Sequence, residues 1–346
     1  MSMEFGIKNE KITKALLKTT IRKALRDIQT DPKRSVRNLV DLGLNFAEGC
    51  NQREIFDITQ HYLSDENSAY FTLAENMVNE IDHEKLVTFG LNFGYNGCTS
   101  GARILREKQT ELGCHLPFLI TFTITDQPDS LSLAEIESAI CQGMELGIFI
   151  YAVICKSDIY PELLETASRF SDCAFIFFVN PRRLTREVIS RTSEIDNLVT
   201  SVRYDGVSDD CLESVGALRA QGCITVAHYE YTSASLDAIL DNSLTEAFAE
   251  TGAIAGILYS EPGADPDVQR KAAEYRAEIG RLQQYPVFIF EAQSDIKRID
   301  AMFSGAECRV HFIGGGKVLY TAEQKIFEGA NLREDTLADI FKRLDF

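Results

Sequence analysis

Two side chains with complementary chemistry, His228 and Glu230, stand two residues apart in the sequence. Residues two apart on a β-strand point to the same face, so this imidazole and carboxylate have the spacing of an acid–base pair or of two metal ligands. No third ligand stands at a matching spacing, and the sequence therefore predicts no metal site. The remaining histidines form no spaced pair and are expected to be ordinary surface or core residues: His61, His83, His115 and His311.

A second group with possible chemistry is the tetrapeptide at residues 155–158, Cys-Lys-Ser-Asp. Lys156 would form a Schiff base, as in aldolases, if burial lowered its pKa, and Cys155 would be a nucleophile if a base lay beside it. A solvated loop lysine and a buried thiol are the more ordinary interpretation. The sequence leaves both open.

Nine cysteines are spread along the chain, no two of them closer than about ten residues. This spacing excludes a CxxC pair, a zinc finger and the CxxxCxxC motif that holds an iron–sulfur cluster. We therefore expect free, mostly buried thiols and no cofactor.

The residues after Leu116 alternate between apolar runs and amphipathic segments, which predicts the elements that position these groups. Continuous β-branched and aromatic runs are typical of parallel strands that are buried on both faces. The expected strands are residues 118–124, 148–154, 174–179, 198–202, 224–229, 254–259, 287–290 and 309–313, and the expected helices are residues 133–146, 161–170, 185–192, 209–221, 235–250 and 265–284.

This alternation predicts α/β architecture, either a (β/α) barrel or a doubly wound sheet. No GxGxxG follows the first strand, which disfavours a dinucleotide fold, and the glycines at 314–316 are expected to form a hairpin. Residues 1–115 show only helical spacing. We predict an N-terminal all-helical domain over residues 1–115, and a full or partial parallel TIM-type barrel with a C-terminal hairpin and helix over residues 116–346.

Active sites of such barrels lie at the carboxyl ends of the strands, so the polar residues at those ends define a candidate pocket. Polar strand ends are also common without any function. The candidate residues are Asp126, Cys155, Lys156, Asp158, Asn180 with Arg182 and Arg183, Arg203, Asp205, His228, Glu230, Ser260, Glu261 and Glu291.

The overall charge limits the classes of partner. The 35 basic and 52 acidic residues give a net charge of −17, which disfavours nucleic-acid binding. Basic residues concentrated at positions 8–37 are expected to line a solvated helix face, with docking of an acidic partner or a membrane surface as the alternative. No segment approaches a membrane span, and the start lacks a secretory signal, so we expect a cytoplasmic protein.

Residues 91–119, LNFGYNGCTSGARILREKQTELGCHLPFL, resemble the lead-in to the first barrel strand of radical S-adenosylmethionine (SAM) enzymes with a helical N-terminal extension. The segments 133–147, 170–175, 202–206, 256–262 and 305–320 continue this resemblance. It implies the barrel fold, a [4Fe–4S] cluster held by CxxxCxxC after the first strand, and a Gly-Gly-Glu-Pro stretch after the second that receives the SAM amino group.

The chain departs from both motifs. The loop at 125–132 reads TDQPDSLS and has no cysteine, and the text after the second strand is Cys-Lys-Ser-Asp. We therefore expect a degenerate radical-SAM-like pseudoenzyme that binds a small-molecule substrate, a peptide or a true radical SAM enzyme, and that forms a homo-oligomer as one possibility. The alternative is a cluster-independent enzyme, aldolase-like, lyase-like or a polar SAM-dependent one, that uses the mouth of the barrel.

Overall fold

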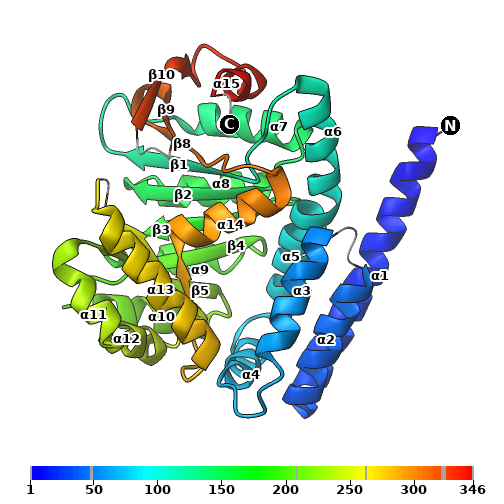
Figure 1. Ribbon diagram of the computed structural model, residues 1–346, viewed down its shortest axis with the longest axis vertical. Helices are drawn as coiled ribbons and strands as arrows, with labels where there is room; N and C mark the ends of the chain where they lie inside the picture. The colour runs from blue at the N-terminus through cyan, green and yellow to red at the C-terminus, as the bar shows by residue number, and fades with distance from the viewer. Residues whose placement is uncertain (1, 47–49, 208, 262, 321–324, 345–346) are drawn as a thin grey trace.

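The computed structural model describes residues 2–46, 50–207, 209–261, 263–320 and 325–344. Figure 1 shows one sheet at the centre, with the first helices standing along one side of it. Those helices are α1 Ser2–Thr30, α2 Pro32–Phe46, α3 Cys50–Tyr62, α4 Tyr70–Glu80, α5 His83–Gly90, the π-helix η1 Leu91–Gly101 and α6 Ala102–Leu112. The described residues before Leu119 contain no strand, so the expected helical N-terminal segment is confirmed.

Within the predicted helical segment, residues 82–93 do not form one continuous α-helix. Asp82 caps α5 by accepting hydrogen bonds from the amides of Glu84 and Lys85, but the chain widens after Gly90 into a π-helix. This turn carries Asn92 and Asn96, whose side-chain amides donate to the carbonyls of residues 171–173 at 2.7 to 2.9 Å. The π-helix is therefore accompanied by hydrogen bonds to a distant segment, and the spacing of apolar residues in the sequence does not reveal it.

The sheet has ten strands in the order β10-β9-β8-β1-β2-β3-β4-β5-β6-β7. Strands β1 to β8 pair in parallel, and β9 and β10 continue the sheet antiparallel beyond β8. Their bounds are β1 Leu119–Thr125, β2 Ile150–Lys156, β3 Ala174–Val179, β4 Leu198–Arg203, β5 Ile224–Tyr231, β6 Ala255–Ser260, β7 Phe288–Glu291, β8 Val310–Ile313, β9 Lys317–Tyr320 and β10 Lys325–Asn331. This is the strand order of a barrel that stays open, because β7 and β8 do not pair within the described residues.

Helices connect the strands largely as predicted, and the glycine turn η4 (Gly314–Gly316) links β8 to antiparallel β9 as expected. The predicted helix at 235–250 is instead two helices, because Asn242 adopts a positive φ of 72° between them. Helix α14 was not predicted, since its buried face includes the polar residues Asp295, Asp300 and Ser304. The bounds are α7 Leu133–Glu145, α8 Tyr160–Arg169, α9 Arg186–Thr192, α10 Asp210–Ala220, α11 Leu236–Leu240, α12 Ser243–Thr251, α13 Pro266–Leu282, α14 Ala292–Ser304 and α15 Leu337–Leu344, with short 3-10 turns η2 Pro181–Arg183 and η3 Ser233–Ser235.

The two faces of the sheet have different surroundings. One face, with Phe122, Tyr151 and Phe177 at its centre, packs into the largest apolar core. On the opposite face, which we call the inner face, the amino-terminal halves of the strands are covered by α5, η1 and α14. Ile150 and Val199 belong to these smaller cores. The carboxyl-terminal half of the inner face is left for polar and partly exposed side chains.

The helical segment and the sheet approach each other closely at one point. Gly101 in η1 lies against Gly147, where the chain turns with a φ of 89° into β2, and a Cβ on Gly101 would lie 2.7 Å from the Gly147 carbonyl oxygen. Only glycine fits such a backbone contact. Because the two segments share cores here, a boundary at residue 115 with independent folding of residues 1–115 stays a prediction.

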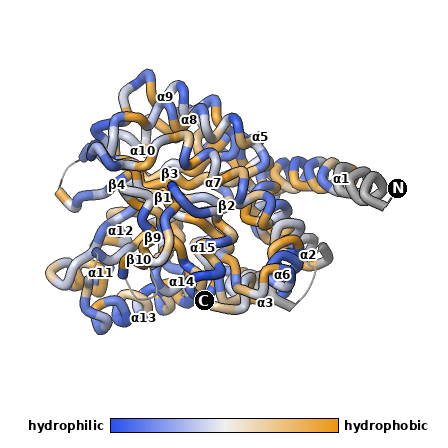
Figure 2. Tube along the Cα trace, turned by 90° about the horizontal axis from the view of Figure 1, so that it is seen from above, coloured by the Kyte–Doolittle hydropathy of each residue, from blue (hydrophilic) through white to orange (hydrophobic). Residues whose placement is uncertain are grey.

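Part of the predicted basic face is neutralised within the chain. Lys18 and Arg22 of α1 pair with Glu84, and Lys33 and Arg37 pair with Glu66. Figure 2 shows the coloured part of helix α1 extending away from the body of the protein. Among the described residues, no helix is both long enough and apolar enough to cross a membrane.

Candidate functional site

The strand register places a set of polar and aromatic side chains together on the inner face, near the carboxyl ends of the strands. Thr125 pairs with Lys156, and Arg203 pairs with His228. One step towards the amino ends, Phe178 on β3 pairs with Ser201 on β4. Paired residues of parallel strands point to the same face, so these side chains share the concave side of the open barrel.

His228 is buried within this set, with 4% of its surface exposed. Its Nδ1 lies 2.9 Å from the Ser201 hydroxyl, and its ring packs against Phe178 at 5.1 Å and Tyr259 at 5.8 Å between centroids. Burial lowers the pKa of His228 to about 3, and the positive charge of Arg203 acts in the same direction. His228 is therefore a neutral hydrogen-bonding group at physiological pH.

His311 lies on the same inner face, although its sequence position indicated only a surface or core residue. Strand β8 pairs with β1, and this pairing brings the His311 Nε2 to 2.7 Å from the Thr123 hydroxyl. Burial lowers the pKa of His311 to about 4, with a smaller contribution from the charge of Lys156. No local signal could have indicated this neighbour, because β1 and β8 are far apart in the chain.

We expect neither His228 nor His311 to become half-protonated when the pH falls from 8 to 5. Protonation would place a charge in a site of low polarity beside existing cations, which keeps both pKa values below the ordinary 6.5. The measurement is an NMR titration of the imidazole Cε1 protons, assigned with the variants His228→Asn and His311→Asn. A midpoint above pH 6 for His228 would contradict the enclosed position described here.

Glu230 and Tyr259 form the next pair along the inner face, where β5 and β6 are in register. Burial raises the pKa of the Tyr259 phenol, and the Glu230 carboxylate, which accepts its hydrogen bond, raises that pKa further. The Tyr259 phenol thus stays protonated and is a hydrogen-bond partner of the Glu230 carboxylate. His228 and Glu230 share a face as their spacing predicts, but each has its own hydroxyl partner.

Arg183 gathers the acidic residues at the ends of the first strands. Its guanidinium pairs with Asp126 at 3.5 Å and with Asp158, and it donates to the Lys156 carbonyl at 3.0 Å. The pKa of Asp126 is lowered, first by a hydrogen bond from the Ser157 side chain and then by Arg183. Both carboxylates are therefore committed to ion pairs.

Lys156 and Arg203 differ from these residues. Both side chains are exposed, and neither has a hydrogen bond or an ion pair with another residue that the structure describes. They are two available cations on β2 and β4, separated by β3.

The structure places two candidate residues on the other face of the sheet. Cys155 is buried in the main core, where its Sγ donates to the Ser157 carbonyl at 3.2 Å and burial raises its thiol pKa. Glu291 is fully buried, accepts a hydrogen bond from the Tyr231 hydroxyl at 2.8 Å, and caps α14 through the amide of Ser294. Cys155 is therefore unsuited to nucleophilic attack, and Glu291 has a structural role as the cap of α14.

The remaining candidates lie in connections between elements. Asn180 caps the turn η2 by accepting from the Arg182 amide at 3.0 Å, and Asp205 accepts from the Val207 amide at 3.0 Å. Ser260 hydrogen-bonds to Gln293, and Glu261 is exposed in the loop after β6.

A hollow between two outer helices does not coincide with this chemistry. It has a volume of about 380 Å³, lies between α8 and α9, and is lined by ion-paired side chains such as Arg191 and Glu165. The inner face near the strand ends, with its two available cations, is therefore the better candidate for a functional site.

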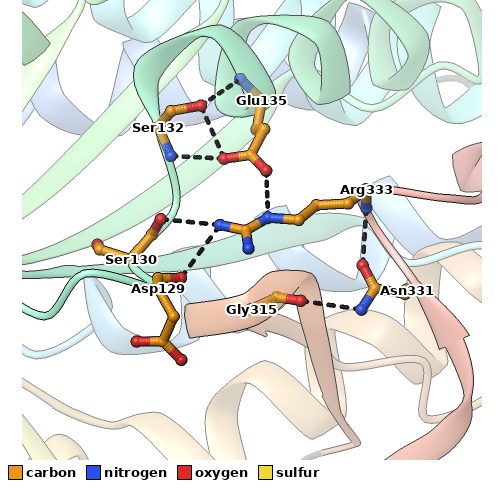
Figure 3. Close-up of polar contacts among 7 residues, drawn as sticks. All are labelled: Asp129, Ser130, Ser132, Glu135, Gly315, Asn331 and Arg333. Atoms are coloured by element: carbon orange, nitrogen blue, oxygen red, sulfur yellow. Dashed lines mark hydrogen bonds and ion pairs between the residues drawn. The ribbon is translucent and has the colours of Figure 1, made fainter.

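The loop between β1 and α7 is fixed by the C-terminal part of the chain, as Figure 3 shows. Arg333 donates to the carbonyls of Asp129 and Ser130 at 3.1 and 3.0 Å, and pairs with Glu135 at the start of α7. The Gly315 amide also donates to the Asp129 carbonyl, at 2.6 Å. Sequence analysis missed Arg333, since nothing in the local pattern places residue 333 beside this loop.

An iron–sulfur cluster does not fit the residues present. The resembled family uses this loop for three thiolates, and residues 125–132 hold none. Among the described residues, no group of three histidine, cysteine or acidic side chains is arranged to hold a metal ion. No reaction step through a cluster follows from this site.

Comparison with solved structures shows which fold this is. The crystal structure of Streptococcus suis SuiB bound to S-adenosylmethionine matches with a TM-score of 0.51 and 11% identity, over 70% of this chain and 68% of SuiB. SuiB bound to its precursor peptide SuiA matches with the same TM-score and identity, over 70% of this chain and 69% of SuiB. These likenesses confirm the expected fold, N-terminal helices followed by a mostly parallel β/α sheet in the form of a partial barrel. No protein-family model and no curated protein sequence matches the chain.

Proposed function

We propose that this chain, with the fold of a radical SAM enzyme, is a binding protein that works without an iron–sulfur cluster. Its ligand would be a small molecule, a peptide or an intact radical SAM enzyme. The observation that carries the proposal is the loop between β1 and α7, which lacks cysteine and is held in place by Arg333.

The thiol chemistry near this loop supports the proposal. Reductive cleavage of SAM needs an electron from a cluster, and a cluster needs thiolate ligands. Cys155 is the cysteine at the strand ends, but it faces the main core, and burial raises its pKa so that the thiolate is disfavoured. Among the residues that the structure describes, none therefore offers a thiolate to a cluster at this end of the sheet.

The tetrapeptide at the end of β2, residues 155–158, argues against binding of SAM in the manner of the resembled family. There, glycine and a carboxylate receive the SAM ammonium group. Here Lys156 brings a positive charge to the corresponding position, and the Asp158 carboxylate is paired with Arg183. An ammonium would meet a like charge without a free carboxylate to offset it.

The alternative of an aldolase-like enzyme finds less support. A Schiff-base lysine needs desolvation to release its proton at neutral pH. Lys156 is exposed, so its surroundings do not supply that desolvation. The peptide form of the binding proposal is motivated by the fold it shares with SuiB, one structure of which holds a precursor peptide.

We expect the protein, purified and reconstituted without oxygen, to retain no stoichiometric iron or sulfide and to form no 5′-deoxyadenosine from SAM with dithionite. An intact radical SAM enzyme reconstituted in parallel is the positive control. About four iron and four sulfide per chain, together with SAM cleavage, would overturn the proposal. Calorimetry is expected to show no micromolar SAM affinity, with Lys156→Gly as the variant that removes the repelling charge.

A further inference from the structure

The carboxyl-terminal half of the inner face carries two cations that are not ion-paired within the described residues. The chain as a whole has a net charge of −17, yet Lys156 and Arg203 are exposed and have no hydrogen bond or ion pair with the described residues. The nearby carboxylates have other neighbours, since Asp126 and Asp158 pair with Arg183, and Glu230 lies beside the Tyr259 phenol. Lys156 and Arg203 are therefore the two side chains at this place that stay available to an anionic ligand.

The two cations are placed where their side chains can reach one ligand. They sit at the ends of β2 and β4, with β3 between them. Neighbouring strands lie about 4.8 Å apart, so the two backbone positions are on the order of 10 Å apart, within the combined reach of lysine and arginine side chains. Both charges also act on His228, which agrees with their facing the same side of the sheet.

The surface between the cations is aromatic. Phe178 on β3 is only partly buried, and its ring contacts the rings of His228 and Tyr259 at 5.1 and 6.4 Å between centroids. The imidazole is neutral, because burial lowers its pKa to about 3, and the phenol is protonated. The floor of this region thus offers apolar ring faces and hydrogen-bonding groups without charge.

We infer that Lys156, Arg203, Phe178, His228 and Tyr259, here called the mouth patch, bind a small oxyanion attached to a planar apolar ring. The phosphate or carboxylate lies between Lys156 and Arg203, whose guanidinium fork matches either group. The ring lies against Phe178, where aromatic stacking adds to the charge interaction. This inference depends on the proposed function in one respect: it requires that no iron–sulfur cluster is bound at this end of the sheet.

The test titrates the full chain with four probes: phenyl phosphate, benzoate, inorganic phosphate and benzylamine. We expect phenyl phosphate and benzoate to show saturable binding by calorimetry or NMR, and inorganic phosphate to bind at least about fivefold more weakly because it lacks the ring. The relative affinities of the first two distinguish a phosphate from a carboxylate ligand. Benzylamine is expected not to bind, because its ammonium meets Lys156 and Arg203.

Variants assign the binding to the mouth patch. Lys156→Gln and Arg203→Gln are each expected to weaken phenyl phosphate binding about fivefold or more, and Phe178→Leu to reduce the advantage over inorganic phosphate. Lys23→Gln, at an exposed position on α1, removes the same charge elsewhere and is the matched control. Circular dichroism and the thermal midpoint show whether each variant is folded.

Two results would overturn the inference. One is the absence of saturable binding of both ring oxyanions up to about 20 mM, an affinity too weak for a site. The other is unchanged binding in the folded Lys156→Gln and Arg203→Gln variants. The iron and SAM assays are independent of these probes, so the proposed function and this inference fail separately.

Discussion

Replacing Lys85 with methionine is expected to lower the free energy of unfolding by about 3 kcal/mol. The ammonium group of Lys85 donates to the carbonyls of Ser193 and Ile195 at 2.6 and 3.0 Å, and its side chain is 4% exposed. These carbonyls precede β4, so the lysine joins helix α5 to the sheet. Methionine retains the apolar stem but leaves two enclosed acceptors without their donor.

Asp196→Asn is the matched control for this prediction. Asp196 also pairs with Lys85, at 3.3 Å, but it is 52% exposed, so losing this ion pair should cost less than about 1 kcal/mol. Denaturant unfolding measures both variants, and hydrogen exchange should show lower protection in α5 for Lys85→Met. An equal loss in the two variants would show that the ion pair, rather than the carbonyl contacts, supplies the stability.

Replacing Asp300 with asparagine is expected to increase stability by about 2 to 3 kcal/mol more at pH 8 than at pH 5. Asp300 is 1% exposed, and its Oδ2 has no hydrogen-bond partner within the described residues. Burial raises the pKa of Asp300 to about 7, although the Phe118 amide donates to its other oxygen. At pH 8 the folded protein must therefore hold an enclosed carboxylate.

The sign follows from proton binding. Between the ordinary pKa near 3.8 and the folded pKa near 7, the folded state binds more protons than the unfolded state, so wild-type stability falls as the pH rises. Asparagine stays neutral at every pH and can still accept from Phe118. Subtracting the wild-type curve from the variant curve removes the contributions of the other titrating groups.

The control for this second experiment is Asp209→Asn. Asp209 is exposed and makes no capping hydrogen bond at the start of α10. Its stability difference from wild type should be flat between pH 5 and pH 8. A flat difference for Asp300→Asn as well would show that this carboxyl group ionises in the folded protein as easily as in the unfolded chain.

The sequence by itself determined the local elements of this protein. Apolar β-branched runs predicted the parallel strands, and their alternation with amphipathic segments predicted the α/β fold, because strand and helix periods depend on near neighbours. The glycines at 314–316 predicted the hairpin between β8 and β9 for the same reason. The absence of cysteine at 125–132 was also readable directly from the residues.

Only the tertiary structure decided which side chains meet. The sequence predicted where the strands end, but not the face of the sheet to which each residue points. Lys156 and His228 point to the inner face, whereas Cys155 and Glu291 point to the opposite face. Side chains alternate between the two faces along a strand, so the residue at which the strand starts decides the face of every later residue. Arg333, which reaches the β1–α7 loop, acts through contacts with residues 203 and 204 positions away in the chain. Such contacts depend on how the strands pair and how the helices pack, and no local periodicity encodes them.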